Sequence, residues 1–211
     1  MKNQLFILLS LSLLLSACAQ ISSLQTAKTL PEDETILGIS VAAYGANGTD
    51  FIGGELGNAL VPHVEFFSRY GVADNFDMGL KLSSSLNIAI DGKYQFFGNE
   101  TSQFAMAVGA AFEYQYSAFE NFVSRQTVPL YFSFHPNDGF ALYATTKFIH
   151  QLVSDGDNNI FLGGNIGLQK RISPKFSIVA EGNNFFIFNS GFKSSGDLIY
   201  QAGIGFIFDL K

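Results

Sequence analysis

From residue 36 onward, apolar side chains alternate with small or polar ones, and the dominant period is two residues. The stretch 103–117 shows the pattern most clearly. One face carries apolar, mostly large residues, namely Phe104, Met106, Val108, Ala110, Phe112, Tyr114 and Tyr116. The other face carries small or polar residues, namely Gln103, Ala105, Ala107, Gly109, Ala111, Glu113, Gln115 and Ser117. A period of two is that of a β-strand with two different faces, so this part of the chain is predicted to be all-β.

Ten stretches with this period are predicted as strands, and eight or twelve strands are the alternatives, because boundaries read from sequence are uncertain by about one hairpin. The stretches lie near residues 36–44, 60–70, 75–83, 86–97, 103–117, 125–135, 139–150, 160–170, 175–186 and 198–210. Short turns at one end alternate with longer loops at the other, apart from the short link Ser84-Ser85. This arrangement, with an even strand number, is typical of a single up-and-down antiparallel transmembrane β-barrel.

The direction in which the apolar face points separates two classes of barrel. A transmembrane barrel turns its large apolar residues toward lipid, whereas a soluble lipocalin-like barrel would enclose them. The polar face carries ten charged residues among many Gly, Ala, Ser and Asn residues, namely Glu65, Arg69, Asp77, Lys81, Asp91, Lys93, Glu113, Lys147, Glu181 and Asp209. Because small residues suit a crowded, curved lumen better than an open surface, these ten are predicted to form a lumen charge network.

Two opposite-charge pairs agree with this orientation. Folding the second and third predicted strands about Ala73 places Arg69 across from Asp77, and Glu65 across from Lys81. Such cross-strand pairs each contribute a few tenths to about 1 kcal/mol. In a confined lumen the paired charges would also satisfy each other's need for polar partners.

Aromatic residues gather beside the short turns. Those with the parity of the apolar face are Tyr70, Phe76, Phe96, Phe104, Phe134, Phe140 and Phe176. Strands favour aromatic residues in general, but repetition at each short turn, on one face, predicts an aromatic girdle at one membrane interface.

The N-terminus has the pattern of a secretory signal peptide, because Lys2 precedes an apolar run that is too short to span a bilayer. Leu15-Ser16-Ala17-Cys18 resembles the lipobox of bacterial lipoproteins, in which the cysteine is acylated and becomes the new N-terminus. The resemblance implies a signal peptide over 1–17 and a lipidation site at Cys18. The polar segment 18–35 has no sustained period and is predicted to be a flexible tether, which leaves 36–211 as the barrel.

The predicted barrel resembles the small outer-membrane β-barrel proteins of Gram-negative bacteria. The stretch 70–80 looks like their tight-turn hairpins, and 200–208 resembles the C-terminal strand that their assembly machinery reads, although the chain ends in Asp209-Leu210-Lys211 instead of an aromatic residue. The resemblance implies an outer-membrane location, with the lipid anchor on the periplasmic side. It also implies outer-membrane lipid and the assembly machinery as partners.

Composition and residue spacing argue against several kinds of partner and site. A net charge of −6 without a basic cluster argues against a nucleic-acid partner, and one cysteine excludes an internal disulfide. No His/Cys/Asp cluster has metal-ligand spacing, so no metal or cofactor is expected. His63 has the lumen parity but no evident acidic partner, and His135 and His150 are expected at the interfaces, so the chain is not predicted to be an enzyme.

Three functions are compatible with these observations. The first is a non-catalytic outer-membrane barrel lipoprotein with a structural or surface-interaction role. The second is a narrow porin or small-ligand transport barrel; a wide pore is not expected, because four large side chains point inward, namely Phe67, Tyr131, Tyr143 and Phe161. The third is a soluble, lipocalin-like periplasmic lipoprotein that binds an apolar ligand. Oligomeric state is not indicated by the sequence.

Overall fold

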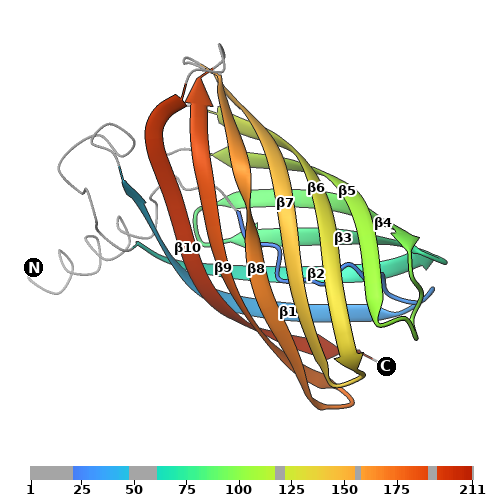
Figure 1. Ribbon diagram of the computed structural model, residues 1–211. Coiled ribbons are helices and arrows are strands. Elements are labelled where there is room, and N and C mark those ends of the chain that lie inside the picture. The colour runs from blue at the N-terminus through green and yellow to red at the C-terminus, as the bar shows by residue number, and fades with distance from the viewer. Residues whose placement is uncertain (1–20, 48–60, 117–121, 155–157, 190–193, 211) are drawn as a thin grey trace, which may run out of the picture.

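The computed structural model describes residues 21–47, 61–116, 122–154, 158–189 and 194–210, and these form one closed antiparallel barrel (Figure 1). Its ten strands are β1 (Thr35–Asn47), β2 (Val61–Ala73), β3 (Phe76–Ser83), β4 (Asn87–Phe97), β5 (Phe104–Tyr116), β6 (Phe122–Asn137), β7 (Phe140–Val153), β8 (Asn159–Ser173), β9 (Phe176–Asn189) and β10 (Ser194–Asp209). Each strand pairs with its neighbours in sequence, and β1 pairs with β10 to close the sheet. The predicted all-β, ten-stranded, up-and-down barrel is confirmed.

The barrel has two distinct ends. At one end, named here the short-turn end, lie the turns β2–β3, β4–β5, β6–β7 and β8–β9, together with the start of β1 and the end of β10. The opposite end, named the long-loop end, carries the other five connections. Among the described residues, no helix is long and apolar enough to cross a membrane.

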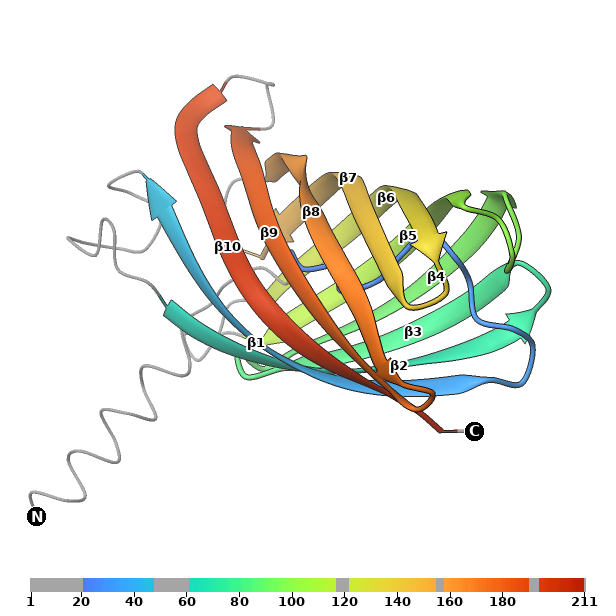
Figure 2. The same cartoon turned by 60° about the horizontal axis from the view of Figure 1, so that its bottom comes forward.

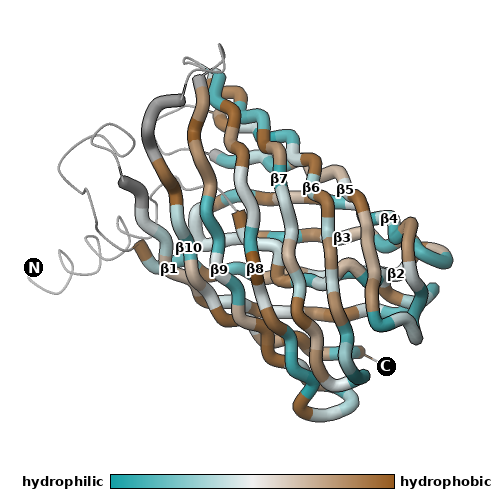
Figure 3. The backbone as a smooth tube through the Cα atoms, in the orientation of Figure 1, coloured by the Kyte–Doolittle hydropathy of each residue, from teal (hydrophilic) through white to brown (hydrophobic). Residues whose placement is uncertain are grey.

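Most of the large apolar side chains point outward, as predicted for a transmembrane barrel. On β5, Phe104 is 58% exposed and Phe112 46%, whereas Ala105 and Ala107 between them are 1% and 0% exposed. Brown and teal segments accordingly alternate along the strands in Figure 3. A lipocalin-like barrel needs the opposite orientation, so that alternative is wrong.

The outward apolar face leads to a prediction about depth in the membrane. Val108 is an outward residue near the middle of β5, and Val72 is an outward residue near the short-turn end of β2. We expect Val108→Arg to destabilise the barrel by about 2–4 kcal/mol, and Val72→Lys by about 0–1 kcal/mol, because the cost of a charge falls toward the interface. Urea unfolding in lipid vesicles would measure both, followed by circular dichroism because the chain lacks Trp. Equal costs would contradict a wall that spans lipid.

The first hairpin differs from the predicted register. The turn lies at Asp74 and Asn75, with Asn75 at φ 62°, and a bulge between Gly71 and Ala73 shifts the pairing. Arg69 therefore lies opposite Gly79 instead of Asp77, and Glu65 opposite Ser83 instead of Lys81. The shift is by two residues, which preserves the face of every side chain.

Candidate functional site: the filled lumen

Residues 21–30 run inside the barrel, and 31–34 turn at its short-turn end into β1; together, 21–34 are named here the luminal segment (Figures 1 and 2). At one end, Ile21 is 1% exposed and belongs to a buried apolar cluster near the long-loop end. The other members of this cluster are Ile149, Phe161, Phe185, Ile187 and Ile199. At the other end, the amide of Asp33 donates to the carbonyl of Gly71 at 3.0 Å, and the chain then enters β1 at the short-turn end. The segment therefore fills much of the length of the lumen.

The expectation of a flexible tether over 18–35 is wrong for residues 21–30, which are buried or half-buried in the lumen. Ser22, Ser23 and Leu24 are 5%, 3% and 2% exposed. A polar stretch can be buried in this way because the lumen wall supplies partners for its backbone groups, as buried amides and carbonyls require. The predicted lipidation site Cys18 lies outside the described residues, and acylation there stays a prediction.

Three lysines of the wall bind carbonyl groups of the luminal segment. Lys147 Nζ donates to the carbonyls of Ile21 (2.6 Å) and Ser22 (2.9 Å). Lys81 Nζ donates to those of Ser22 (3.0 Å) and Ser23 (3.3 Å). Nearer the short-turn end, Lys93 Nζ donates to the carbonyls of Thr26 (3.0 Å) and Lys28 (2.8 Å). All three lysines thus recognise backbone oxygen, which every sequence offers.

Acceptors on the wall bind the amide groups of the same segment. Glu181 accepts from the amide of Ser23 through Oε1 and from that of Leu24 through Oε2, both at 2.8 Å. Further amide donors are Ala27 to Ser133 Oγ, Thr29 to Gln95 Oε1 and Leu30 to Asp77 Oδ2. The wall therefore holds both the donors and the acceptors of the segment's backbone.

The contact with Glu181 coincides with an unusual backbone conformation. Leu24 has a φ of 54°, in the left-handed region that bulky residues rarely adopt. Such a conformation costs on the order of 1–3 kcal/mol and persists only where the surroundings enforce it. Here the two bonds to Glu181 and the packing of the Leu24 side chain with Phe67, Tyr143 and Val179 enforce it.

The wall also contains ion pairs of its own. Arg69 Nη1 lies 2.6 Å from Asp91 Oδ1, and Arg69 also pairs with Asp77. Asp77 in turn lies 3.4 Å from Lys93 Nζ. The Arg69–Asp77 contact forms diagonally despite the shifted register, whereas Lys81 is turned to the luminal segment instead of forming the expected cross-strand pair with Glu65.

Nine of the ten residues predicted for the lumen charge network are buried inside the barrel, namely Glu65, Arg69, Asp77, Lys81, Asp91, Lys93, Glu113, Lys147 and Glu181. Asp209 is half-buried at the end of β10. Sequence reasoning missed Arg125, which is 4% exposed, pairs with Glu113 and donates to Gln151 Oε1 at 2.7 Å. Its parity with the inward residue Tyr131 on the same strand was the available signal.

The seven residues predicted for the aromatic girdle lie toward the short-turn ends of their strands and are exposed or half-buried on the outer face. Phe104 and Phe134 stack with their ring centroids 4.7 Å apart, and Phe176 lies 5.2 Å from Phe208. Tyr70 donates to Asp33 Oδ1 at 2.6 Å, next to the point where the luminal segment leaves the lumen. Their role as a membrane girdle stays a proposal.

Gly71 allows the luminal segment to dock against β2. A Cβ placed on Gly71 would lie 1.8 Å from the carbonyl oxygen of Pro31, whereas one on the outward Gly182 would meet nothing within 4 Å. We expect Gly71→Ala to cost about 1–3 kcal/mol, since backbone must move to accommodate the methyl group. Gly182→Ala is the matched control and should leave stability within about 0.5 kcal/mol. Urea midpoints in the same vesicles would compare the two, and equal midpoints would contradict the docked segment.

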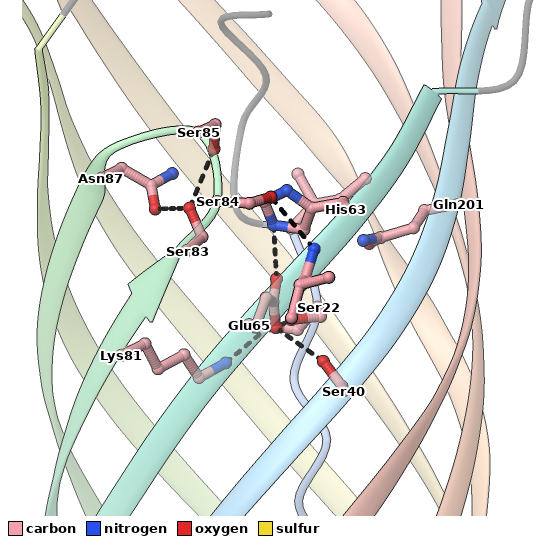
Figure 4. Close-up of polar contacts among 12 residues, drawn as sticks. Ser22, Ser40, His63, Glu65, Lys81, Ser83, Ser84, Ser85, Asn87 and Gln201 are labelled. Carbon is pink, nitrogen blue, oxygen red and sulfur yellow. Dashed lines mark hydrogen bonds and ion pairs between the residues drawn. The ribbon is translucent and has the colours of Figure 1, made fainter. Parts of the chain in front are cut away.

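His63 does have an acidic neighbour, which sequence reasoning missed. Its Nε2 lies 3.2 Å from Glu65 Oε1, two positions along the same inward face of β2 (Figure 4). The other oxygen of this carboxylate, Glu65 Oε2, accepts a hydrogen bond from the Ser22 hydroxyl at 2.5 Å. The Ser40 hydroxyl lies 3.5 Å from the same oxygen. The carboxylate therefore stands between the histidine and these hydroxyl groups, whereas in a Ser-His-Asp triad the histidine stands between the serine and the carboxylate.

His135 and His150 contact neutral groups. His135 Nε2 lies 2.9 Å from Ser133 Oγ, and His150 Nδ1 lies 3.1 Å from Gln126 Oε1. Within the described ranges, no three His, Cys, Asp or Glu side chains are grouped in a way that would hold a metal ion.

Comparisons with known proteins bear on the fold. No protein-family model matches the chain, and no curated protein matches it. Among solved structures, an outer-membrane channel from Pseudomonas putida F1 is similar with a TM-score of 0.52 at 8% identity, over 87% of this chain and 98% of that one. The outer-membrane protease OmpT from Escherichia coli gives 0.44 at 10% identity, over 88% and 100% of the two chains. Ail, the attachment invasion locus protein of Yersinia pestis, gives 0.38 at 14%, over 85% and 99%. The chain thus has the fold of a bacterial outer-membrane barrel, and these low identities carry no activity over to it.

Proposed function

We propose that the protein is a non-catalytic, integral β-barrel of the outer membrane, closed by its own N-terminal segment, with a structural or surface-interaction role in the cell envelope. The outward apolar wall supports insertion into lipid. The luminal segment carries the proposal, because Lys81, Lys93, Lys147 and Glu181 are engaged by the chain's own backbone instead of being presented to a substrate. Lipid and the barrel-assembly machinery are its expected partners.

Fractionation of cells tests membrane insertion. The protein should stay in membranes washed with sodium carbonate, and after detergent extraction it should migrate differently on gels before and after boiling. Recovery wholly in the soluble periplasmic fraction would refute the proposal.

The Cys18→Ser variant separates insertion by the barrel from attachment by a lipid. Because the outer wall is apolar, we expect this variant to require detergent for extraction just as the wild type does. Release of Cys18→Ser into buffer would mean that the lipid alone holds the protein to the membrane.

Acylation of Cys18 has its own test, since the chain contains one cysteine. A cysteine whose sulfur carries a lipid through a thioether does not react with maleimide in denaturant, whereas a free thiol does. We expect the mature protein to be unreactive and to have a mass that includes the acyl chains.

A second candidate function, a narrow polar path, is favoured by one row of wall residues. Thr145, Asn165, Asn183 and Gln201 pair across β7, β8, β9 and β10. In the described structure each has a buried side-chain atom without a hydrogen-bond partner. Buried polar atoms of this kind are sites for water or a small polar solute. Channel events from the intact protein in planar bilayers would support this function, and their absence would count against it.

A further inference from the structure

The luminal segment has a defined direction along the barrel axis. Ser22 bonds to Glu65, which lies opposite the last residue of β3 at the long-loop end. Ala27 bonds to Ser133, in the part of β6 that approaches the short-turn end. Leu30 bonds to Asp77, at the start of β3. Sequence order and position along the axis therefore agree, and the segment descends from the long-loop half to the short-turn end.

The segment is long enough to cross the membrane. Ten extended residues, 21–30, span at most about 33–36 Å. The hydrocarbon core of a bilayer is about 30 Å thick. The segment turns at Leu24 and is therefore shorter than this limit, but its bonds still reach from Glu65 in the long-loop half of the wall to Asp77 near the short-turn end.

The lumen is suited to an extended chain of small residues. Ala27 packs with Ala105, Ala107 and Tyr131 on the wall, where larger side chains would fill the space that the segment occupies. Most of the bonds described above go to backbone amides and carbonyls, and side-chain bonds from Ser22 to Glu65 and from Gln25 to Tyr131 add to them. The wall therefore holds this polypeptide mainly through its backbone.

The path of the segment determines where the preceding chain leaves. Thr35 begins β1 at the short-turn end, so residues before Ile21 join the segment at its opposite end. Between Ile21 and the short-turn end, the lumen is occupied by the segment itself. The opening at the long-loop end is therefore the one next to Ile21.

We propose that the barrel conducts its own N-terminus across the outer membrane and displays it on the cell surface. This inference rests on the proposed function, together with the usual orientation of outer-membrane barrels, in which the longer loops face the outside and the short turns face the periplasm. Cys18 precedes Ile21 by three residues, a reach of roughly 10 Å. If Cys18 is acylated, this topology would put its lipid on the cell-surface side of the membrane, and not on the periplasmic side that the sequence resemblance implies.

Epitope accessibility in intact cells tests this topology. One variant carries an octapeptide tag between Gln20 and Ile21, and matched controls carry it after Ser154, at the long-loop end, or after Asp138, at the short-turn end. A membrane-impermeant antibody should bind the Gln20 and Ser154 variants in intact cells, and the Asp138 variant only after the outer membrane is permeabilised. Heat-modifiable migration confirms that each tagged barrel has folded.

The controls separate failure of the inference from failure of the proposed function. Binding to the Ser154 tag in intact cells, with the Gln20 tag reached only after permeabilisation, overturns the surface display of the N-terminus. A Ser154 tag that stays hidden in intact cells, or an exposed Asp138 tag, overturns the membrane orientation itself. Gln20→Cys, labelled with a maleimide on a polyethylene glycol chain, provides a second readout if the inserted tag prevents folding. Labelling in intact cells supports display, and labelling only after permeabilisation overturns it.

Discussion

Deleting residues 21–30 is expected to turn a closed barrel into a conducting pore. The deletion removes the segment that occupies the lumen and leaves the charged side chains of Lys81, Lys93, Lys147 and Glu181 without the backbone groups that they bind. Water and ions would then solvate these charges, because buried charges require polar partners. Planar-bilayer recordings should show current steps that the intact protein does not give.

The matched control keeps the backbone and changes the side chains. Replacing residues 21–30 with five Gly-Ser repeats preserves length and most hydrogen-bonding groups, so we expect this variant to remain closed for most of the recording. Openings as frequent as those of the deletion would mean that the Ile21 and Leu24 side chains, not the backbone bonds, retain the segment. A deletion variant with no larger steps than the intact protein would contradict the filled lumen.

Arg69→Met is expected to be the most destabilising single substitution in the barrel wall. Arg69 is 4% exposed and contacts both Asp77 and Asp91, so its removal leaves two buried carboxylates without their shared cation. Breaking a buried ion pair in this way costs about 3–5 kcal/mol. Urea unfolding in lipid vesicles would measure the loss.

Two further variants show whether the stability lost in Arg69→Met comes from its ion pairs. Arg171 is exposed near the β8–β9 turn, and Arg171→Met should change stability by less than about 0.5 kcal/mol. The double variant Arg69→Met/Asp91→Asn should recover part of the loss, because one of the uncompensated charges is also removed. Similar values for the two arginine variants would show that the Arg69 network does not stabilise the fold.

The barrel itself was predictable because its determinants repeat along the chain. Alternation with a period of two fixes the face of each side chain, and Phe104, Ala105 and Ala107 lie on the expected faces. The turns were located less well, since a bulge at Gly71 shifts the first hairpin without disturbing the alternation. Face is therefore a more robust prediction than register in this chain.

The luminal segment was not predictable in the same way. A single extended chain inside a barrel has no repeating buried face, and the short polar residues of 21–30 resemble those of a linker. Its partners on the wall, such as Glu181 and Lys147, are bonded to its backbone, and a backbone contact leaves no mark on the sequence. The predicted network of wall charges was the one indirect sign, because so many buried charges need partners.

Glu65, in contrast, makes a contact that the sequence did indicate. The sequence analysis paired Glu65 with Lys81 and left His63 without an acidic partner. His63 and Glu65, however, lie two positions apart on one face of the strand. Distance along a single strand is a local feature that needs no register, so the His63–Glu65 contact was available from the sequence.

The closed seam between β1 and β10 constrains how the molecule is made. Twelve residue pairs join these strands, from Ile36 with Asp209 to Asn47 with Leu198, and the barrel that they close surrounds the chain that leads into β1. If the barrel closed first, the bulky N-terminal end of the chain would have to pass through its narrow lumen. We therefore expect the leading stretch to take its place first during biogenesis, and the hydrogen bonds between β1 and β10 to form around it afterwards.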